Sequence, residues 1–156
     1  MSASGSWTKT LSARAPQNPN SCIMANADCQ DETTDYSFKL NGSFELPKGF
    51  KASPVYRFQA GSNFSRTFVG KLNYTIATLN AEAANGERYP DINLIDLRID
   101  RGIQTGKGRI SPFFDVYNIT NANPEQNLTV ASGSSWLRPV NIVPPRVARI
   151  GVKFDW

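Results

Sequence analysis

Three aspartates, Asp96, Asp100 and Asp115, could form a carboxylate cluster, the kind of group that acts in acid–base catalysis. The chain has no histidine, and no residue stands out as a nucleophile with a base beside it. Basic residues are interleaved with the aspartates, namely Arg57, Arg98 and Arg149. The sequence therefore favours a network of paired charges, and we expect a protein that is not an enzyme.

A glycine-rich segment, Gly102–Gly108, has some features of a phosphate-binding loop. Its spacing is one residue shorter than that loop requires, and neither Ser nor Thr follows Lys107. We interpret the segment as a turn between strands, so the sequence indicates no cofactor.

The two cysteines, Cys22 and Cys29, lie in a polar segment rich in Asn, Asp, Gln and Pro. The favoured interpretation is a disulfide that closes a small loop, which implies an oxidising compartment. Two free thiols are the alternative. A zinc site is not favoured, because the chain offers no further Cys and no His as ligands.

The composition indicates one folded domain outside the nucleic-acid-binding class. The chain has 156 residues, of which 40% are hydrophobic and 19% charged, and its formal charge of +4 is scattered rather than clustered. No apolar run is long enough for a membrane helix. The start has no export signal, so we expect either a mature chain or a fragment.

The end of the chain, residues 146–156, is the clearest element, because its side chains alternate in character with a period of two. One row is apolar (Ala148, Ile150, Val152, Phe154, Trp156) and the other is mostly polar (Val147, Arg149, Gly151, Lys153, Asp155). This period predicts a β-strand. An apolar-out strand of about 9–11 residues is what a transmembrane barrel requires.

Further strands are predicted at 36–46, 50–60, 92–101 and 109–119, with a weaker one at 6–13. Within them, Pro54 predicts a local bulge or a gap in the hydrogen-bond ladder.

The predicted connections alternate strictly in length. Segments 14–35, 61–90 and 120–143 are long, and 61–90 is expected to contain a hairpin of its own, whereas 47–49 and 104–107 are short. In an antiparallel meander this alternation places all long loops at one end, as in outer-membrane barrels. Tyr89 and Trp136 lie beside long loops, where we expect them to pack the loops rather than to bind a ligand. The predicted fold is all-β: an antiparallel up-and-down meander of about six strands, part of a large transmembrane β-barrel.

Several short motifs from Asp35 onward follow one another in a characteristic order: Gly42–Pro47, Arg57–Gly61 with Arg66, Tyr89–Arg98, Phe113–Asn118, Ser134–Pro139, Pro144–Arg149 and Gly151–Trp156. In this succession the chain resembles the C-terminal end of TonB-dependent outer-membrane receptors, of the type that carries an N-terminal carboxypeptidase-regulatory-like domain. The ending also resembles the signal read by the barrel-assembly machinery, with Ile150, Val152, Phe154 and Trp156 as the residues that carry it.

The resemblance implies a transport protein of the bacterial outer membrane, for a ligand that the sequence does not identify. Residues 1–156 would be a C-terminal fragment of one barrel domain, with a weak strand and an outer loop in 1–35 and barrel strands and loops in 36–156. The family's plug domain and most of its barrel strands are missing from this sequence. Implied partners are therefore the rest of the barrel, the plug, membrane lipid, the assembly machinery and, through the plug, the energy-coupling TonB system.

On this hypothesis the polar row faces the barrel lumen: Lys39, Asn41, Glu45, Arg57, Asp96, Arg98, Asp115, Arg149 and Lys153. Aromatic residues would form girdles at the two membrane interfaces: Tyr36, Phe44, Phe50, Phe154 and Trp156. The sequence leaves two alternatives open. One is a soluble secreted β-sandwich binding module whose apolar rows meet inside, and the other is a small barrel closed by oligomerisation.

Overall fold

The computed structural model describes residues 1–13, 30–82 and 85–156. Cys22 and Cys29 lie outside these described residues, so their predicted disulfide stays a prediction. No helix in the described part of the chain is long and apolar enough to cross a membrane.

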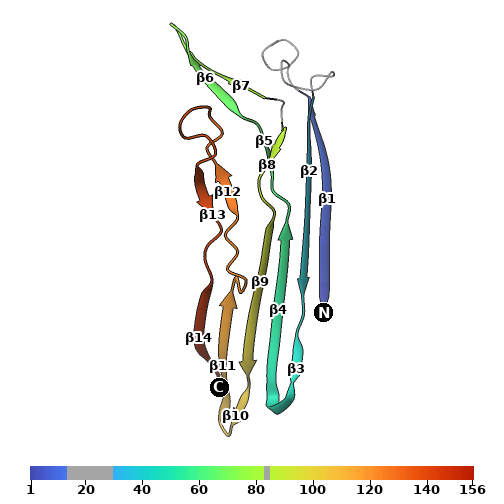
Figure 1. Ribbon diagram of the computed structural model, residues 1–156. Coiled ribbons are helices and arrows are strands. Elements are labelled where there is room, and N and C mark those ends of the chain that lie inside the picture. The colour runs from blue at the N-terminus through green and yellow to red at the C-terminus, as the bar shows by residue number, and fades with distance from the viewer. Residues whose placement is uncertain (14–29, 83–84) are drawn as a thin grey trace.

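The strands of the large sheet follow one another as an antiparallel meander (Figure 1). Its six long strands are β1 (Ser2–Ala13), β2 (Gln30–Asn41), β4 (Phe50–Gln59), β9 (Ile92–Arg101), β11 (Gly108–Tyr117) and β14 (Val147–Asp155). Two short strands, β3 (Phe44–Leu46) and β10 (Ile103–Thr105), extend the sheet beside the turns. The predicted all-β fold and meander order are confirmed, whereas the sheet itself is open, with β1 and β14 as its two edges.

The predicted strand 36–46 is divided into β2 and β3, and three further strand boundaries differ from the prediction by two residues or more. β2 begins at Gln30 rather than at 36, because its first residues pair with β1. The prediction missed them because both of their rows are polar and give no periodic signal. β1 begins at Ser2 rather than at 6. The prediction missed these first residues because the side chains of Ser2 to Gly5 are too small to show an alternating pattern. β11 ends at Tyr117 because the next residue, Asn118, has a φ of 51° and leaves the extended conformation.

Pro54 produces the predicted gap, without a bulge. Toward β9 the register runs unbroken through Ser53↔Arg98, Pro54↔Leu97 and Val55↔Asp96. On the other side the ladder is interrupted between β2 and β3, although the Gly42 amide still donates to the Pro54 carbonyl at 3.2 Å. Proline has no N–H, so Pro54 cannot donate a hydrogen bond back to Gly42. The missing ladder bond therefore affects only the side of β4 that faces β2 and β3.

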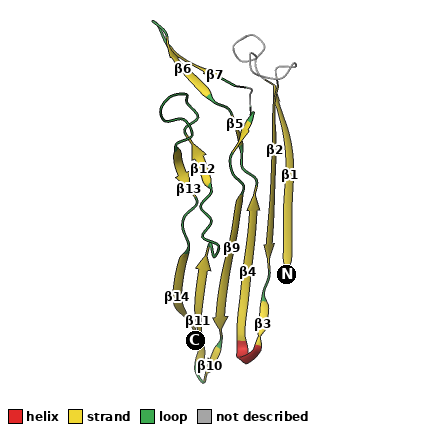
Figure 2. Ribbon diagram, in the orientation of Figure 1, coloured by secondary structure: helices red, strands yellow, loops and turns green. Residues whose placement is uncertain are grey.

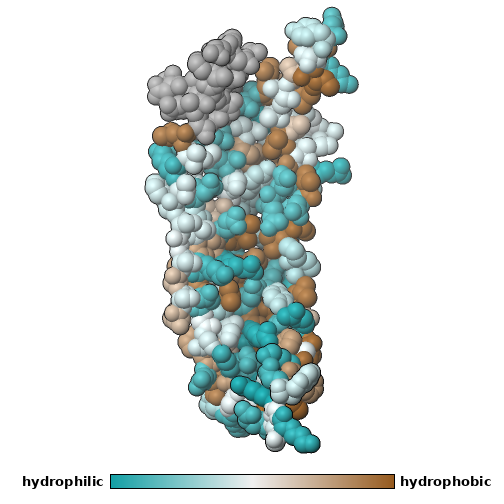
Figure 3. Space-filling model, turned by 180° about the vertical axis from the view of Figure 1, so that it is seen from behind, coloured by the Kyte–Doolittle hydropathy of each residue, from teal (hydrophilic) through white to brown (hydrophobic). Residues whose placement is uncertain are grey.

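The register sorts the side chains onto two faces of opposite character. In sequence order the apolar face carries Trp7, Tyr36, Phe38, Leu40, Tyr56, Phe58, Ile95, Leu97, Ile99, Phe114, Val116, Ile150, Val152 and Phe154. The whole predicted lumen row shares the opposite face. Figure 3 shows the molecule from behind, with many hydrophilic side chains over the lower half of the strands.

The large sheet is a single layer, and within the described residues no second sheet packs on its apolar face (Figure 1). Phe38 is 42% exposed and Val152 is 51% exposed, so neither is inside a core. A sandwich would require these side chains to meet a second sheet. The described residues therefore give no support to the sandwich alternative.

Loop lengths are segregated as predicted (Figure 2). At one end lie the tight turns, a single 3₁₀ turn at Pro47–Gly49 and the β10–β11 hairpin. At the other end lie β5 (Asn63–Phe64) paired with β8 (Glu87–Arg88), the hairpin of β6 (Thr67–Lys71) and β7 (Ile76–Asn80), and the pair β12 (Glu125–Leu128) and β13 (Pro139–Ile142). The hairpin expected in 61–90 is confirmed, whereas the strand pair in 120–143 was not predicted.

The buried apolar side chains of the described residues gather at this loop end rather than in the sheet. They are Ala60, Phe64, Leu128 and Val143. The two long segments at this end, 61–90 (the first excursion) and 120–143 (the second excursion), also share backbone hydrogen bonds. The Thr67 amide donates to the Val130 carbonyl at 2.8 Å, and the Ser132 amide donates to the Thr67 carbonyl at 2.6 Å. Both excursions therefore pack as one unit above the sheet.

Gly61 closes the base of the first excursion. Its amide donates to Asp91 Oδ1 at 3.0 Å, and Arg88 Nε donates to its carbonyl at 2.7 Å. A Cβ at this position would collide with the carbonyl oxygen of Tyr89. The close approach of two backbones is thus the reason for glycine here.

Replacing Gly61 with Ala is expected to destabilise the fold by about 1–3 kcal/mol, because the backbone of Tyr89 must shift to admit the methyl group. The matched control is Gly106→Ala, since an added Cβ at Gly106 meets no atom within 4 Å. Urea unfolding of the detergent-solubilised chain measures both variants. Equal midpoints for the two variants would contradict this account of Gly61.

Candidate functional site

The charged face of the large sheet is centred on Asp115, which is 2% exposed. Arg149 donates to Asp115 Oδ2 through Nη2 at 2.6 Å and through Nε at 3.1 Å. Arg98 Nε lies 3.7 Å from Asp115 Oδ1, and the register places Arg98 and Arg149 directly beside Asp115 on its two neighbouring strands. One carboxylate thus links three strands, and two guanidinium groups cover it.

Phe113 lies next to this cluster and supports both arginines. The Arg98 guanidinium is 4.2 Å from the centre of its ring, and the Arg149 guanidinium is 5.5 Å from it. The ring lies across Gly151, its partner on β14, where any Cβ would collide with it. Glycine opposite Phe113 therefore lets the aromatic ring lie flat under the cations.

A second ion pair extends the network to β4. Arg57 Nη2 lies 2.6 Å from Asp96 Oδ2, while the other oxygen of Asp96 accepts a bond from the Asn118 amide at 2.9 Å. Nearer the turns, Lys153 Nζ lies 2.8 Å from Asp155. The predicted interleaving of aspartates and arginines as a charge network is confirmed, and its exposure to a lumen stays a prediction.

Asn118 joins the sheet to the second excursion, a role that the sequence did not reveal. Its side-chain amide donates to the carbonyl oxygens of Ala122 at 2.8 Å and Pro144 at 2.9 Å, and its Oδ1 accepts from the Ala122 amide. The residue is 4% exposed, with every one of these polar groups satisfied. The sequence signal that could have indicated this role is an Asn directly after a strand, because Asn tolerates the positive φ that ends a strand.

The aromatic residues flagged beside the loops pack together, as predicted. Phe64 lies 4.5 Å from Tyr89 and 6.3 Å from Trp136, measured between ring centres. Arg66 stacks over Trp136 at 5.0 Å and donates to Ser132 Oγ at 3.0 Å. These contacts come from both excursions, so the cluster connects them.

The predicted assembly-signal residues lie on or beyond the edge strand β14. Ile150, Val152 and Phe154 share the apolar face and are 79%, 51% and 60% exposed. Trp156, the last residue, is completely exposed. All four side chains are therefore exposed at the free edge of the described sheet.

Within the described residues no three Cys, Asp or Glu side chains come together as a metal site. No family model matches the chain, and neither a curated protein nor a solved structure matches it.

Replacing Asp115 with Asn should destabilise the sheet by about 1–3 kcal/mol, because two arginines lose the buried carboxylate that balances them. The control is Asp155→Asn, whose partner Lys153 is well exposed, so that variant should change stability by less than about 1 kcal/mol. Chemical unfolding in detergent micelles measures the difference. If both variants unfold alike, Asp115 does not hold the three strands together.

Proposed function

We propose that this chain is the C-terminal wall and closing strand of a TonB-dependent outer-membrane receptor, which transports a ligand not yet identified. The observation that carries the proposal is the single-layer sheet, with one continuous apolar face that the described chain leaves uncovered. Soluble monomers rarely expose apolar patches of this extent. Hydrocarbon lipid covers such a face without a second sheet.

The distribution of aromatic and charged residues supports contact with a bilayer. On β4, Phe50 and Phe58 lie eight positions apart, which is about 27 Å along the strand and about 19–22 Å across a wall whose strands tilt by about 35–45°. Trp7 pairs with Tyr36 at the level of Phe58, and Phe154 lies at the turn end with Phe50. These positions correspond to two girdles whose separation approaches the height of a barrel's apolar band, about 25 Å.

Charges on the apolar face occur only near its two ends. Lys9 pairs with Glu32 at 2.7 Å, farther toward the long loops than Trp7. Arg101 lies at the turn end, 5.1 Å from the ring of Phe50. Asn93 carries a polar amide on this face, but it lies directly opposite Phe58, at the level of a girdle, and its side chain accepts a hydrogen bond from the Tyr56 hydroxyl at 2.9 Å. This arrangement keeps unpaired charge out of hydrocarbon.

The free edges support a role as part of a larger barrel. β1 and β14 each present an unpaired row of backbone groups, which lipid cannot satisfy. Pairing with further strands of a parent barrel removes both edges. In the parent, the charged face would meet the plug and water, and the loop-end unit would contact the medium outside the cell.

An epitope tag inserted at Gly133 should be detected by antibody on intact cells, whereas the same tag at Gly106 should be detected only after the outer membrane is permeabilised. The reason is that Gly133 lies in the second long excursion and Gly106 in a tight turn at the opposite end. Both tags should appear in the outer-membrane fraction of cells that express the parent gene. A soluble, detergent-free monomer, or equal access to both tags on intact cells, would overturn the proposal.

Deleting Phe154–Trp156 from the parent protein should reduce its outer-membrane level at least about tenfold, because the exposed apolar end of the edge strand is lost. Quantitative blotting of membrane fractions measures this level. The control removes three residues of comparable exposure from the β6–β7 hairpin, at Leu72, Asn73 and Tyr74. Normal surface levels of the first variant would refute the assembly role.

A further inference from the structure

Nearly every basic side chain on the charged face has a carboxylate beside it. Arg57 pairs with Asp96, and Arg98 and Arg149 share Asp115. Lys51 lies between Glu45 and Asp100 in the register, Lys153 pairs with Asp155, and Arg109 is directly opposite Asp155. Charge on this part of the sheet is therefore balanced locally.

Lys39 is the exception among the described residues of this face. Its cross-strand neighbours are Ser4 on β1 and Arg57 on β4, so a hydroxyl and a second cation lie on its two sides. The positions next to it on β2, Ser37 and Asn41, are neutral. Two like charges directly opposite each other are unfavourable, and the Asp96 carboxylate compensates only Arg57.

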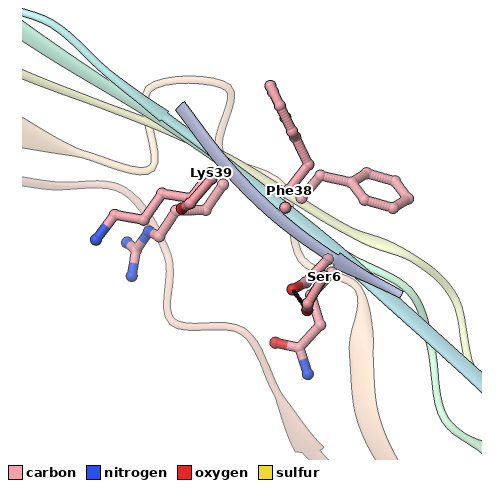
Figure 4. Close-up of a pocket in the computed structure, with 9 residues that line it drawn as sticks. Ser6, Phe38 and Lys39 are labelled. Carbon is pink, nitrogen blue, oxygen red and sulfur yellow. Dashed lines mark hydrogen bonds between the residues drawn. The ribbon is translucent and has the colours of Figure 1, made fainter. Parts of the chain in front are cut away.

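The surroundings of Lys39 form a shallow hollow of about 300 Å³. Figure 4 shows Lys39 and Ser6 on one side of the sheet and Phe38 on the other. Further polar side chains on the face that carries Lys39 also line the hollow: Ser4, Ser6, Ser37, Arg57 and Gln59. Ser6 and Ser37 already share a hydrogen bond of 2.8 Å. The hollow thus offers the uncompensated cation Lys39, with the Ser4 hydroxyl directly across from it on β1.

We propose that Lys39 binds an Asp or Glu side chain of the segment that fills the barrel interior, so that this hollow is a docking point for the plug. The inference rests on the proposed function, which places the charged face against that plug. Charge complementarity identifies the occupant: a carboxylate balances Lys39 and relieves its repulsion with Arg57. The hydroxyl of Ser4, directly opposite Lys39, can hydrogen-bond its second oxygen.

Carbodiimide treatment of outer membranes that contain the full-length parent tests the proposal. This reagent joins an amine and a carboxylate in direct contact as an amide, and mass spectrometry identifies the linked peptides. The expected product links Lys39 to an acidic residue of the plug. A Lys39 peptide that stays unlinked, or that is linked only within 1–156, would overturn the inference.

Charge reversal supplies an independent readout. Lys39→Glu should increase the rate at which an added protease cleaves the plug at least about tenfold, because the docked carboxylate now meets a like charge. Lys39→Arg should keep the wild-type rate, and so should Lys71→Glu, the same reversal on the exposed β6–β7 hairpin. An unchanged rate for Lys39→Glu would contradict the docking role.

The outcomes separate this inference from the proposed function. If the parent reaches the outer membrane with the expected loop exposure, but neither the cross-link nor the protease effect appears, the docking point alone is refuted. If the parent gene encodes no plug and no further barrel strands, the proposed function fails and the inference fails with it.

Discussion

Alternation of side chains across a single layer of strands is the constraint on which this structure depends. A slip of one residue in any strand would exchange its apolar and charged rows, so that charges would leave the network and enter the apolar face. The sheet has no second layer in the described chain to correct such an error. Register must therefore be fixed within the plane, by contacts between neighbouring strands.

Three local devices fix the register of the C-terminal half. Asp115 accepts hydrogen bonds from β14 while it lies against Arg98 of β9, and it is buried because both arginines lie over it. The Phe113 ring fits only where Gly151 stands opposite. Asn118 ends β11 with a left-handed residue and ties the following loop to Pro144. Together they position β14, whose outer edge carries the apolar chain end.

The strand pattern was predictable from the sequence wherever apolar and polar residues alternate cleanly, as in β4, β9 and β14. The charge network was predictable for the same reason, since Asp96, Arg98, Asp115 and Arg149 occupy the polar row. The start of β2 was missed because its residues are polar on both rows, and the β12–β13 pair was missed because each strand has only four residues, too few for a clear periodic signal. Gly61 and Asn118 were missed as structural residues because contacts across the chain, rather than local spacing, determine their roles.

Pro54 in β4 has a mechanical consequence for the large sheet. An unbroken ladder resists shear along its whole length, but the seam between β2/β3 and β4 lacks the return bond at Pro54. Strain along this ladder must concentrate on the remaining hydrogen bond from the Gly42 amide to the Pro54 carbonyl, because the paired segments on either side of it are stiffer. The sheet can therefore bend at the level of Pro54, while the β4–β9 ladder beside it stays intact.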